Sequence, residues 1–300
     1  MALGKLQYLL PVIPWAVDQM KFDDFDVVLS SSSGFVKNIR VPKNTIHICY
    51  CHTPPRFLWI DKEYIKQEVP FLLRPFVKYI LSKIQKWDLA GSKRVTHFLA
   101  NSKEVQKRIK EIYNRESEVV YPGINTDFWK PTIQKQNYFL IAGRLQPHKH
   151  NESIIEIFNE LGLPLHVVGT GRQEEYLKSM AKPNITFLGA VDDAKLRDEY
   201  NGALGFIYPQ VEDFGLMPLE AAGCGTATIA LAKGGALETV TAGITGELFE
   251  NYDKEKIKQI ILGWGVKKYQ TELLKYHAQK FSKDIFKEQV SDFVNLSFRI

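Results

Sequence analysis

The chain has 300 residues, which is enough for two domains of ordinary size, each with its own core. With 45% hydrophobic and 24% charged residues it has the balance of a globular protein, and no apolar run approaches the roughly 20 residues of a transmembrane helix. Three cysteines, Cys49, Cys51 and Cys224, are too few for a disulfide framework and lack the spacing of a zinc site. We therefore expect a cytoplasmic protein without structural disulfides or zinc.

The positive net charge of +5 is concentrated in the first part of the chain. Residues 1–130 hold 20 Lys and Arg against 13 Asp and Glu, whereas residues 131–300 hold 19 against 21. A basic half is typical of proteins that bind nucleic acid, an anionic membrane surface or a phosphorylated substrate, but solvated helices often carry such an excess without any partner. We expect no nucleic-acid partner, because the aromatic platform of such proteins is missing.

Four strand candidates alternate with helical stretches in the first 130 residues. A helix is expected after Ser102, which has the character of an N-cap before KEVQKRIKEIY. Strands that alternate with helices at this spacing indicate a parallel sheet. The candidates are FDVVLSSSSG (25–34), TIHICYCHTPP (45–55), VTHFLANS (95–102) and SEVVYPGI (117–124).

A basic, aromatic stretch lies between the second and third of these strands. Residues 74–94, RPFVKYILSKIQKWDLAGSKR, place lysines and arginines among Phe76, Tyr79, Ile80, Ile84 and Trp87. A helix of this kind can rest on an anionic membrane surface, near a lipid-linked acceptor. It can equally be a helix that packs on the core and turns a basic side to solvent.

Six further strand candidates follow a polar connector near residues 131–137, which predicts a second sheet. Helices are expected over 152–162, from Gln173 to Met180, around Leu196 and from about Pro218. The strand candidates are YFLIAGRL (138–145), PLHVVGTG (164–171), ITFLGAV (185–191), ALGFIYP (203–209), TATIAL (226–231) and GELFE (246–250). Such a series is sufficient for a complete open α/β sheet.

The segment EDFGLMPLEAAGCG, residues 212–225, follows one of these strands and contains two acidic residues. Glu212 lies in the loop, and Glu220 falls in the opening turns of the next helix. The amides of Phe214, Gly215 and Leu216 would point from the helix N-terminus towards an anion. A carboxylate beside phosphate-binding amides can accept hydrogen bonds from two vicinal sugar hydroxyls. A plain strand–loop–helix connection with solvated acids has the same spacing.

Two other loops follow strands of the same predicted sheet. AGRLQPHK, residues 142–149, carries Arg144 and Lys149 at a strand's carboxyl end, where open α/β sheets bind ligands. Two fixed cations suit a diphosphate, although either residue alone is compatible with an ordinary surface position. VVGTGR, residues 167–172, supplies a glycine-bearing turn after the next strand. Together the loops predict a ligand that bears phosphate.

His52 ends the second strand of the first half, immediately before Thr53-Pro54-Pro55. The two prolines stiffen the loop and hold the imidazole at the carboxyl end of the strand. A lone histidine in this position is either catalytic or structural.

These segments resemble glycosyltransferase family 4, the retaining group with the GT-B fold, from FDVVLSSSSG to FSKDIF. The most specific part is the two-glutamate motif, Glu212 and Glu220, followed by AAGCGTATIA. GRLQPHK resembles the family's arginine–lysine diphosphate motif. YCHTPPRFLW, WDLAGSKRVTHFLANS and VVYPGINTDFW resemble a mannosyltransferase-like subgroup.

The resemblance implies an α/β protein with two Rossmann-like domains facing across a cleft. Residues 1–131 would form the acceptor-side domain, residues 132–270 the donor-binding domain, and residues 271–300 a C-terminal helix that packs back towards the first domain. The family's opening strand and glycine-rich loop, roughly 70 residues, are absent, so an incomplete first sheet would expose an unpaired edge. We expect self-association or a partner that covers this edge.

The resemblance also assigns roles, residue by residue. Arg144 and Lys149 would bind the donor diphosphate, and Glu220 would bind the ribose hydroxyls. Glu212 would face the transferred sugar, and His52 would lie near its anomeric carbon and C6 hydroxyl. Further donor contacts would come from the amides of Phe214, Gly215 and Leu216, from the turn at Gly169, and from Val191 and Asp193 at the nucleobase.

The implied reaction moves mannose or a similar hexose from a GDP- or UDP-linked donor to a saccharide or lipid-linked hydroxyl, with retention and without a cofactor. The side-chain cations would stand in for a metal, because Asp23-Asp24 and Asp192-Asp193 are adjacent pairs and no Asp-x-Asp motif is placed to bind one. Thr170 and Arg172 depart from the acidic residue and proline that relatives often carry. The alternative is a catalytically silent nucleotide-sugar-binding or scaffold subunit that needs a partner chain.

Overall fold

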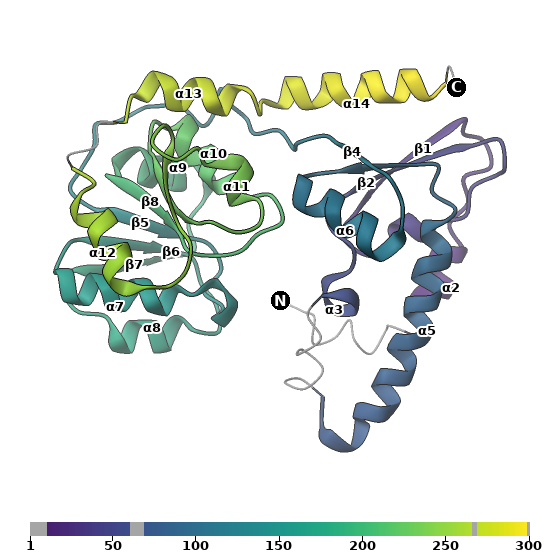
Figure 1. Ribbon diagram of the computed structural model, residues 1–300, viewed down its shortest axis with the longest axis horizontal. Coiled ribbons are helices and arrows are strands. Elements are labelled where there is room, and N and C mark those ends of the chain that lie inside the picture. Colours follow the sequence, from purple (N-terminus) through teal and green to yellow (C-terminus); the bar gives the residue numbers. More distant parts are fainter. Residues whose placement is uncertain (1–10, 61–68, 266–268, 299–300) are drawn as a thin grey trace. The chain divides into compact units, whose positions relative to one another are not determined.

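The computed structural model describes residues 11–60, 69–265 and 269–298. The chain divides into two compact units. The first unit comprises Met1–Tyr121 and Gln289–Ile300, and the second comprises Pro122–Glu288. Each unit contains a parallel β-sheet with helices packed on it (Figure 1).

The sheet of the first unit has four parallel strands in the order β1-β2-β3-β4. All four strands fall within the segments that the sequence predicts. They are β1 Val27–Ser32, β2 Ile46–Cys51, β3 His97–Ala100 and β4 Glu118–Val119. β2 is buried along almost its whole length, whereas β1 alternates, with Leu29 48% exposed. The edge strand β1 therefore has one open face.

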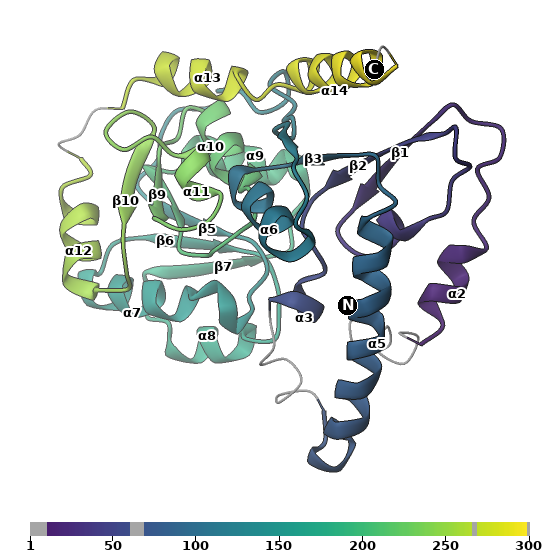
Figure 2. The same cartoon turned by 45° about the vertical axis from the view of Figure 1, so that its right-hand side comes forward.

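Helices of the first unit connect these strands. Their bounds are α2 Ile13–Asp18, η1 Val36–Asn38, α3 Arg56–Trp59, η2 Phe71–Leu73, α5 Arg74–Ser92 and α6 Lys103–Tyr113. The Ser102 hydroxyl accepts a hydrogen bond from the Val105 amide at 3.1 Å, which confirms the predicted N-cap of α6. α5 runs beside the sheet, and its N-terminal end extends away from it (Figures 1 and 2).

A buried polar network joins η1, α3, α5 and α6 in the first unit. The Asp88 carboxylate forms an ion pair with Lys37 and accepts hydrogen bonds from the Asn38 amide at 3.1 Å and from Trp59 Nε1 and the Tyr113 hydroxyl at 2.9 Å. Lys37 is 1% exposed, and Asn38 and Asp88 are 0% exposed. A charge can be buried in this way because every oxygen of the carboxylate has donors around it.

The sheet of the second unit has six parallel strands in the order β10-β9-β8-β5-β6-β7. Counted from β5, this is the strand order of a doubly wound dinucleotide-binding sheet. The six predicted strands are all present. They are β5 Phe139–Ala142, β6 Leu165–Val168, β7 Ile185–Gly189, β8 Gly205–Tyr208, β9 Thr228–Leu231 and β10 Gly246–Phe249. Every residue of β5, β8 and β9 is buried, as expected where helices cover both faces.

Helices follow the strands of the second unit. Their bounds are η3 Pro147–Lys149, α7 Asn151–Leu161, α8 Glu174–Met180, α9 Asp193–Gly202, α10 Leu216–Gly223, α11 Ala236–Thr239, α12 Lys254–Leu262 and α13 Thr271–Gln279. α14, Lys283–Ser297, continues into the first unit from Gln289. Residues 271–300 thus contain two helices where the sequence analysis expected one. None of the helices in the described parts of the chain combines the length and apolar character needed to cross a bilayer.

The sequence predicted that α10 begins at about Pro218. It begins two residues earlier, at Leu216, after Gly215 in the left-handed region as N-cap (φ +92°). Pro218 is therefore the third helical residue. Its ring nitrogen carries no hydrogen and cannot donate a hydrogen bond. This loss costs the helix nothing, because the amides of the first turn have no acceptor within the helix.

Candidate functional site

The second unit has a topological switch point between β5 and β8. These strands are adjacent, with Ile141 paired with Ile207, yet the chain leaves β5 towards β6 and leaves β8 towards β9 on the opposite side. The connections that follow the two strands run to opposite sides, and in open α/β sheets this is the place where ligands bind, at the carboxyl ends of the strands. Residues 143–149 and 209–215 form these two connections.

Lys149 and Glu212, which are 63 residues apart, meet across the two connections. The Lys149 ammonium donates a hydrogen bond to Oε1 of Glu212. Their side chains are 6% and 33% exposed, so the lysine is held inside while the carboxylate stays open to solvent. The structure therefore brings together one residue from each of two motifs that the sequence analysis selected separately.

Arg144 belongs to the same connection as Lys149 but is exposed. Within the described parts of the chain its guanidinium has no hydrogen bond or ion pair with another side chain. No three acidic, histidine or cysteine side chains of the described residues lie together as a cation site. The fixed positive charges of the β5 connection are thus Lys149, already paired, and Arg144, available to an anion.

The glycine turn after β6 packs directly on the connection after β5. A Cβ atom at Gly169 would lie 1.9 Å from the Gly143 carbonyl oxygen, and Gly169 has a φ of +121°. The backbone joins the two turns through Gly143 N to Val168 O at 3.0 Å and Leu145 N to Thr170 O at 2.9 Å. Gly169 therefore has a structural role, which is to support the loop that carries Arg144.

A second glycine turn supports the loop of Glu212, and the sequence analysis missed it. The Gly235 amide donates to the Glu212 carbonyl at 2.9 Å. A Cβ atom at Gly235 would lie 1.9 Å from the Phe214 carbonyl oxygen, so no other residue fits there without displacing the loop. The signal was the pair Gly234-Gly235 in the loop that follows β9, again at a strand's carboxyl end.

The N-terminus of α10 is positioned by Phe214, which is 4% exposed and packs against Phe281 with ring centroids 5.8 Å apart. Among the described residues no acceptor is found for the amides of Gly215 or Leu216. These amides belong to the positive end of the helix dipole. Their role in binding an anion, which the sequence predicted at this helix, stays a prediction.

Glu220 lies one turn into α10, beside α9. The Tyr200 hydroxyl donates to its Oε2 at 3.4 Å. Burial raises the pKa of the Glu220 carboxyl to about 7, and the negative charge of Asp193 adds to this effect. Because Asp193 acts on Glu220 electrostatically, two residues predicted to hold the nucleoside lie in one neighbourhood. Asp193 is exposed as the first residue of α9, and Val191 is half-buried just before it.

Tyr208, at the end of β8, lies close to both glutamates of the motif and was not predicted. It is 1% exposed, and burial raises the pKa of its hydroxyl, with the charges of Glu212 and Glu220 contributing. Its hydroxyl would lie 3.3 Å from a Cβ atom at Gly215. Sequence reasoning missed Tyr208 and Tyr200 because an aromatic residue in a strand or helix is normally interpreted as part of the hydrophobic core.

His52 belongs to the first unit, at the carboxyl end of β2. Its Nε2 shares a hydrogen bond of 2.8 Å with the Ser31 hydroxyl, and its ring packs edge-on against Tyr50 at 5.1 Å. The His52 amide donates to the Ser32 carbonyl at 2.8 Å. The serines at the end of β1 thus orient His52, while its predicted role at the transferred sugar stays a prediction.

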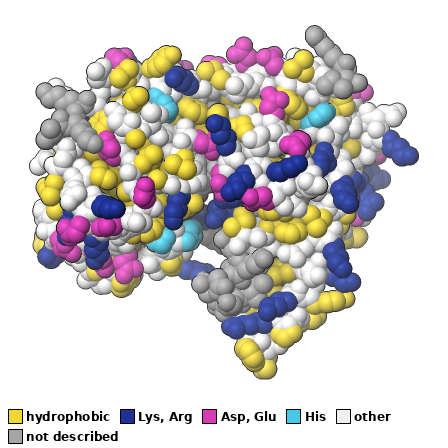
Figure 3. All heavy atoms as spheres, in the orientation of Figure 1, with side chains coloured by type: hydrophobic (Ala, Val, Ile, Leu, Met, Phe, Trp, Pro, Cys, Tyr) yellow, Lys and Arg dark blue, Asp and Glu magenta, His cyan; other side chains and the backbone are white. Residues whose placement is uncertain are grey.

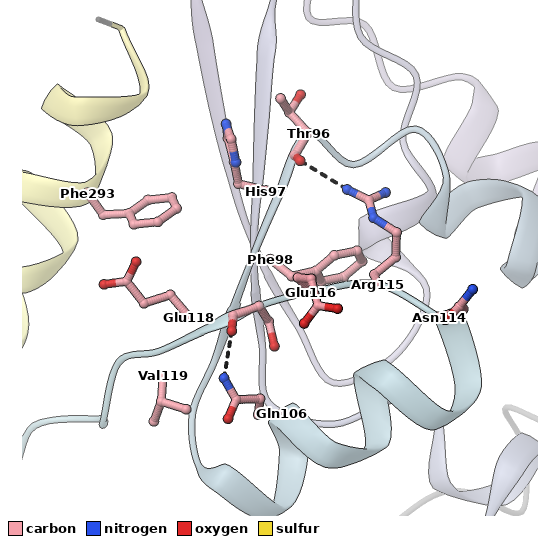
Figure 4. A pocket seen from close by; sticks show the side chains of 11 residues that line it. Thr96, His97, Phe98, Gln106, Asn114, Arg115, Glu116, Glu118, Val119 and Phe293 are labelled. Atoms are coloured by element: carbon pink, nitrogen blue, oxygen red, sulfur yellow. Dashed lines mark hydrogen bonds between the residues drawn. The ribbon is translucent and has the colours of Figure 1, made fainter. Parts of the chain in front are cut away.

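The first unit also contains a cavity of about 800 Å³. None of the predicted site residues lines it, and it lies at the amino end of β3, near Phe293 of α14 (Figure 4). Two of its polar side chains are engaged by the chain itself: Arg115 donates to the carbonyls of Val95 and Thr96, and Gln106 to that of Ser117. We assign no ligand to this cavity.

Comparison with known proteins gives two family matches that cover most of the chain. The family described as glycosyl transferases group 1 matches residues 123–280. The family described as glycosyltransferase family 4 matches residues 2–128.

Individual relatives agree with these families. The chain is 31% identical to the O-antigen chain mannosyltransferase RfbU of Salmonella typhimurium over 55% of its own length and 49% of the relative. It is 32% identical to a GDP-mannose-dependent monoacylated alpha-(1-6)-phosphatidylinositol monomannoside mannosyltransferase of Corynebacterium glutamicum, over 40% of its own length and 35% of the relative. The chain thus spans half or less of the length of these curated relatives.

Among solved structures, sucrose-phosphate synthase from Thermosynechococcus elongatus is similar over 100% of this chain and 80% of its own, with a TM-score of 0.74 and 18% identity. This likeness concerns the fold alone. Together with the two parallel α/β sheets it confirms the predicted GT-B fold class.

Proposed function

Because the chain belongs to the glycosyl transferases group 1, with a family 4 glycosyltransferase segment before it, we propose that it transfers a hexose from a nucleoside-diphosphate donor to a hydroxyl acceptor. We further propose that the hexose is mannose, that the nucleotide is GDP and that the anomeric configuration is retained. The names of two relatives, both mannosyltransferases and one GDP-mannose-dependent, support the choice of sugar and nucleotide.

A single observation carries this proposal: Lys149 contacts Glu212 at the switch point of a doubly wound sheet. The contact joins a cation from the β5 connection to a carboxylate from the β8 connection, beside the N-terminus of α10. Cation, carboxylate and helix amides in one crevice suit a ligand that combines phosphates with sugar hydroxyls.

In this proposal the diphosphate is the leaving group, and its growing negative charge is stabilised by fixed charges and dipoles. Arg144 offers a planar guanidinium to one phosphate, and Lys149 offers an ammonium to the other. The amides of Gly215 and Leu216 add the helix dipole. These groups take the role that a divalent cation has in other transferases, so we propose that transfer needs no metal.

The remaining contacts fix the donor at its two ends. Glu220 accepts hydrogen bonds from the ribose hydroxyls, while Val191 and Asp193 lie at the nucleobase. Glu212 accepts from hydroxyls of the transferred sugar, which requires that Lys149 be shared between the carboxylate and a phosphate. We keep His52 as the residue near the anomeric carbon.

Nucleotide binding tests the diphosphate site. Calorimetry should show that GDP binds at least tenfold more tightly than GMP, with and without EDTA, because Arg144 and Lys149 both need phosphate oxygens. Arg144→Gln should remove most of this difference. Arg172→Gln, an exposed arginine of the neighbouring turn, is the matched control and should keep it. Equal affinity for GDP and GMP, or binding abolished by EDTA, would contradict the site.

Transfer itself needs a separate test, because a silent donor-binding subunit would pass the first one. The purified chain with GDP-mannose should release GDP when a saccharide or lipid-linked acceptor is supplied, and NMR of the product should show the α-anomer. Tight donor binding without turnover, even with varied acceptors, would instead identify a binding subunit that needs a partner chain.

A further inference from the structure

Several strongly exposed apolar side chains of the first unit gather at the start of α5. Within the described residues, the 3-10 turn η2 and the first two turns of α5 expose five of them. They are Phe71 at 76%, Leu72 at 87%, Leu73 at 54%, Phe76 at 64% and Tyr79 at 61% exposed. We call these five residues the apolar tip. Side chains of this size are rarely left in water as a contiguous group without a partner surface.

The apolar tip does not pack on the core, because the N-terminal end of α5 extends beyond the core. The buried residues of α5 begin at Leu81 and continue through Ile84 and Asp88 to Gly91 and Ser92. The first seven residues of the helix include no buried position. In both views of the ribbon, this end of α5 lies far from the sheet of its unit (Figures 1 and 2).

Cations accompany the apolar tip. Arg74, Lys78, Lys83 and Lys86 lie on the same helix, and residues 69–87 contain no Asp or Glu. The Arg74 guanidinium lies 5.7 Å from the Phe71 ring centre, and the Lys83 ammonium lies 5.2 Å from that of Tyr79. Figure 3 shows hydrophobic side chains at this end of the molecule with Lys and Arg beside them. We call these four residues the basic collar.

We propose that the apolar tip and basic collar form a surface that docks on an anionic lipid bilayer. Exposed Phe, Leu and Tyr side chains enter the boundary between headgroups and acyl chains, where aromatic rings are favoured. The lysines and the arginine stay at the level of the headgroups and neutralise anionic lipid. Helix α5 would thus bind by its first turns and hold the remainder of the unit outside the bilayer.

A bilayer explains the combination better than a second copy of the chain does. A symmetric contact between two copies places the same patch on both sides, so it would bring the four cations of each collar together. Such a contact would bury the apolar tip only at the expense of like-charge repulsion. An anionic bilayer can bury the apolar tip and neutralise the basic collar at the same time. The basic excess of residues 1–130 has the same sign.

This inference does not rest on the proposed transferase function, because docking is measured without donor or acceptor. If both hold, the surface would bring the chain to an acceptor attached to lipid. Failure of one leaves the other unaffected.

The test is sedimentation of the full chain with extruded vesicles, either pure phosphatidylcholine or phosphatidylcholine with 30% phosphatidylglycerol. We expect at least tenfold stronger binding to the anionic vesicles. Each cation near an anionic surface contributes about fivefold to partitioning, so the triple variant Lys78→Gln/Lys83→Gln/Lys86→Gln should lose about 100-fold. Phe71→Ser/Leu72→Ser should also reduce binding by more than tenfold.

Matched variants in the second unit control for general loss of charge or apolar surface. Lys254→Gln/Lys256→Gln/Lys280→Gln removes three exposed lysines, and Leu262→Ser/Leu273→Ser removes two exposed leucines. Both should bind anionic vesicles as the parent chain does. Circular dichroism should be unchanged for all four variants, since every substituted side chain is exposed or lies outside the core.

Three outcomes would overturn the proposal. The first is binding that does not depend on anionic lipid. The second is an equal loss in the control variants. The third is a concentration-dependent dimer in vesicle-free solution that Phe71→Ser/Leu72→Ser abolishes, because that would make the apolar tip an interface between copies.

Discussion

The sheets of the two units are buried in different ways. In the second unit every residue of the central strands β5, β8 and β9 is buried, and the side chains are almost all apolar. In the first unit, β1 leaves Leu29 half exposed, and the neighbouring core includes the buried ion pair of Lys37 and Asp88. The second sheet is a conventional apolar core, whereas the first depends on polar contacts that each need a particular partner.

This difference predicts where the molecule is vulnerable. Apolar packing is spread over many side chains, so one substitution removes a small share of it. A buried ion pair is concentrated in two groups, and the loss of one leaves the other charged and unpaired. We therefore expect the first unit to be the more sensitive to single substitutions and to pH.

The largest effect should come from Asp88→Ala. It leaves the Lys37 ammonium buried without its partner, which typically costs about 3–5 kcal/mol. Urea denaturation followed by tryptophan fluorescence should show an early transition, while GDP binding by the second unit persists. The joint variant Lys37→Met/Asp88→Leu should be much less destabilised. Loss of GDP binding together with the first transition would mean that the units do not unfold separately.

The second effect is a pH dependence that belongs to the first unit. Burial lowers the pKa of His47 from 6.5 to about 4, and the charges of Arg94 and Lys37 act in the same direction. In the unfolded chain the imidazole binds a proton below pH 6.5, but in the folded chain it does so only near pH 4. Stability should therefore fall by about 3 kcal/mol as the pH decreases from 7 to 4. His47→Gln should flatten this slope, and an unchanged slope would contradict the assignment.

Strand positions could be predicted from the sequence because buried parallel strands are short apolar runs between turn residues. YFLIA and GFIY are examples, and β5 and β8 occupy them. The start of α10 was harder to predict, because the sequence does not show that Gly215 adopts a left-handed conformation and caps the helix. Pro218 suggested a later start, since proline is favoured at the first helical position.

The sequence predicted which residues belong to the site, but not which of them contact one another. Lys149 and Glu212 were each selected from their place after a strand, but their contact depends on β8 lying next to β5, which only the strand order provides. The same holds for Ser31 beside His52 and Tyr200 beside Glu220. Gly169 was selected as a ligand-binding turn, which stays a prediction; the close approach of the Gly143 carbonyl, which gives it a packing role as well, could not be predicted from the sequence.

A third prediction concerns the second unit, where the main pH effect should be on binding rather than folding. Hydroxyl donors favour the ionised form of Glu220, whose pKa is raised to about 7 by burial. GDP affinity should therefore increase about tenfold between pH 6 and pH 7.5. Glu220→Ala should weaken binding by about 1.5–3 kcal/mol.

Glu220→Gln serves as the control for this pH effect. Its amide oxygen still accepts a hydrogen bond, but the residue does not titrate, so calorimetry should show only the pH dependence of GDP itself. Identical pH profiles for the parent chain and Glu220→Gln would remove Glu220 from the nucleotide site.

The smallest effect compares helix caps in the two units. Ser102 caps α6 in the first unit, and the Asp253 carboxylate caps α12 in the second by accepting from the Glu255 amide at 3.1 Å. Ser102→Ala and Asp253→Ala should each cost about 1 kcal/mol, because each leaves an amide of the first turn without its acceptor. If the units unfold separately, Ser102→Ala should increase amide exchange only in the first unit, and Asp253→Ala only in the second. Amide exchange that increases throughout the chain in either variant would show that the two units unfold as one cooperative structure. The two sheets would then differ in how they are packed, but not in when they unfold.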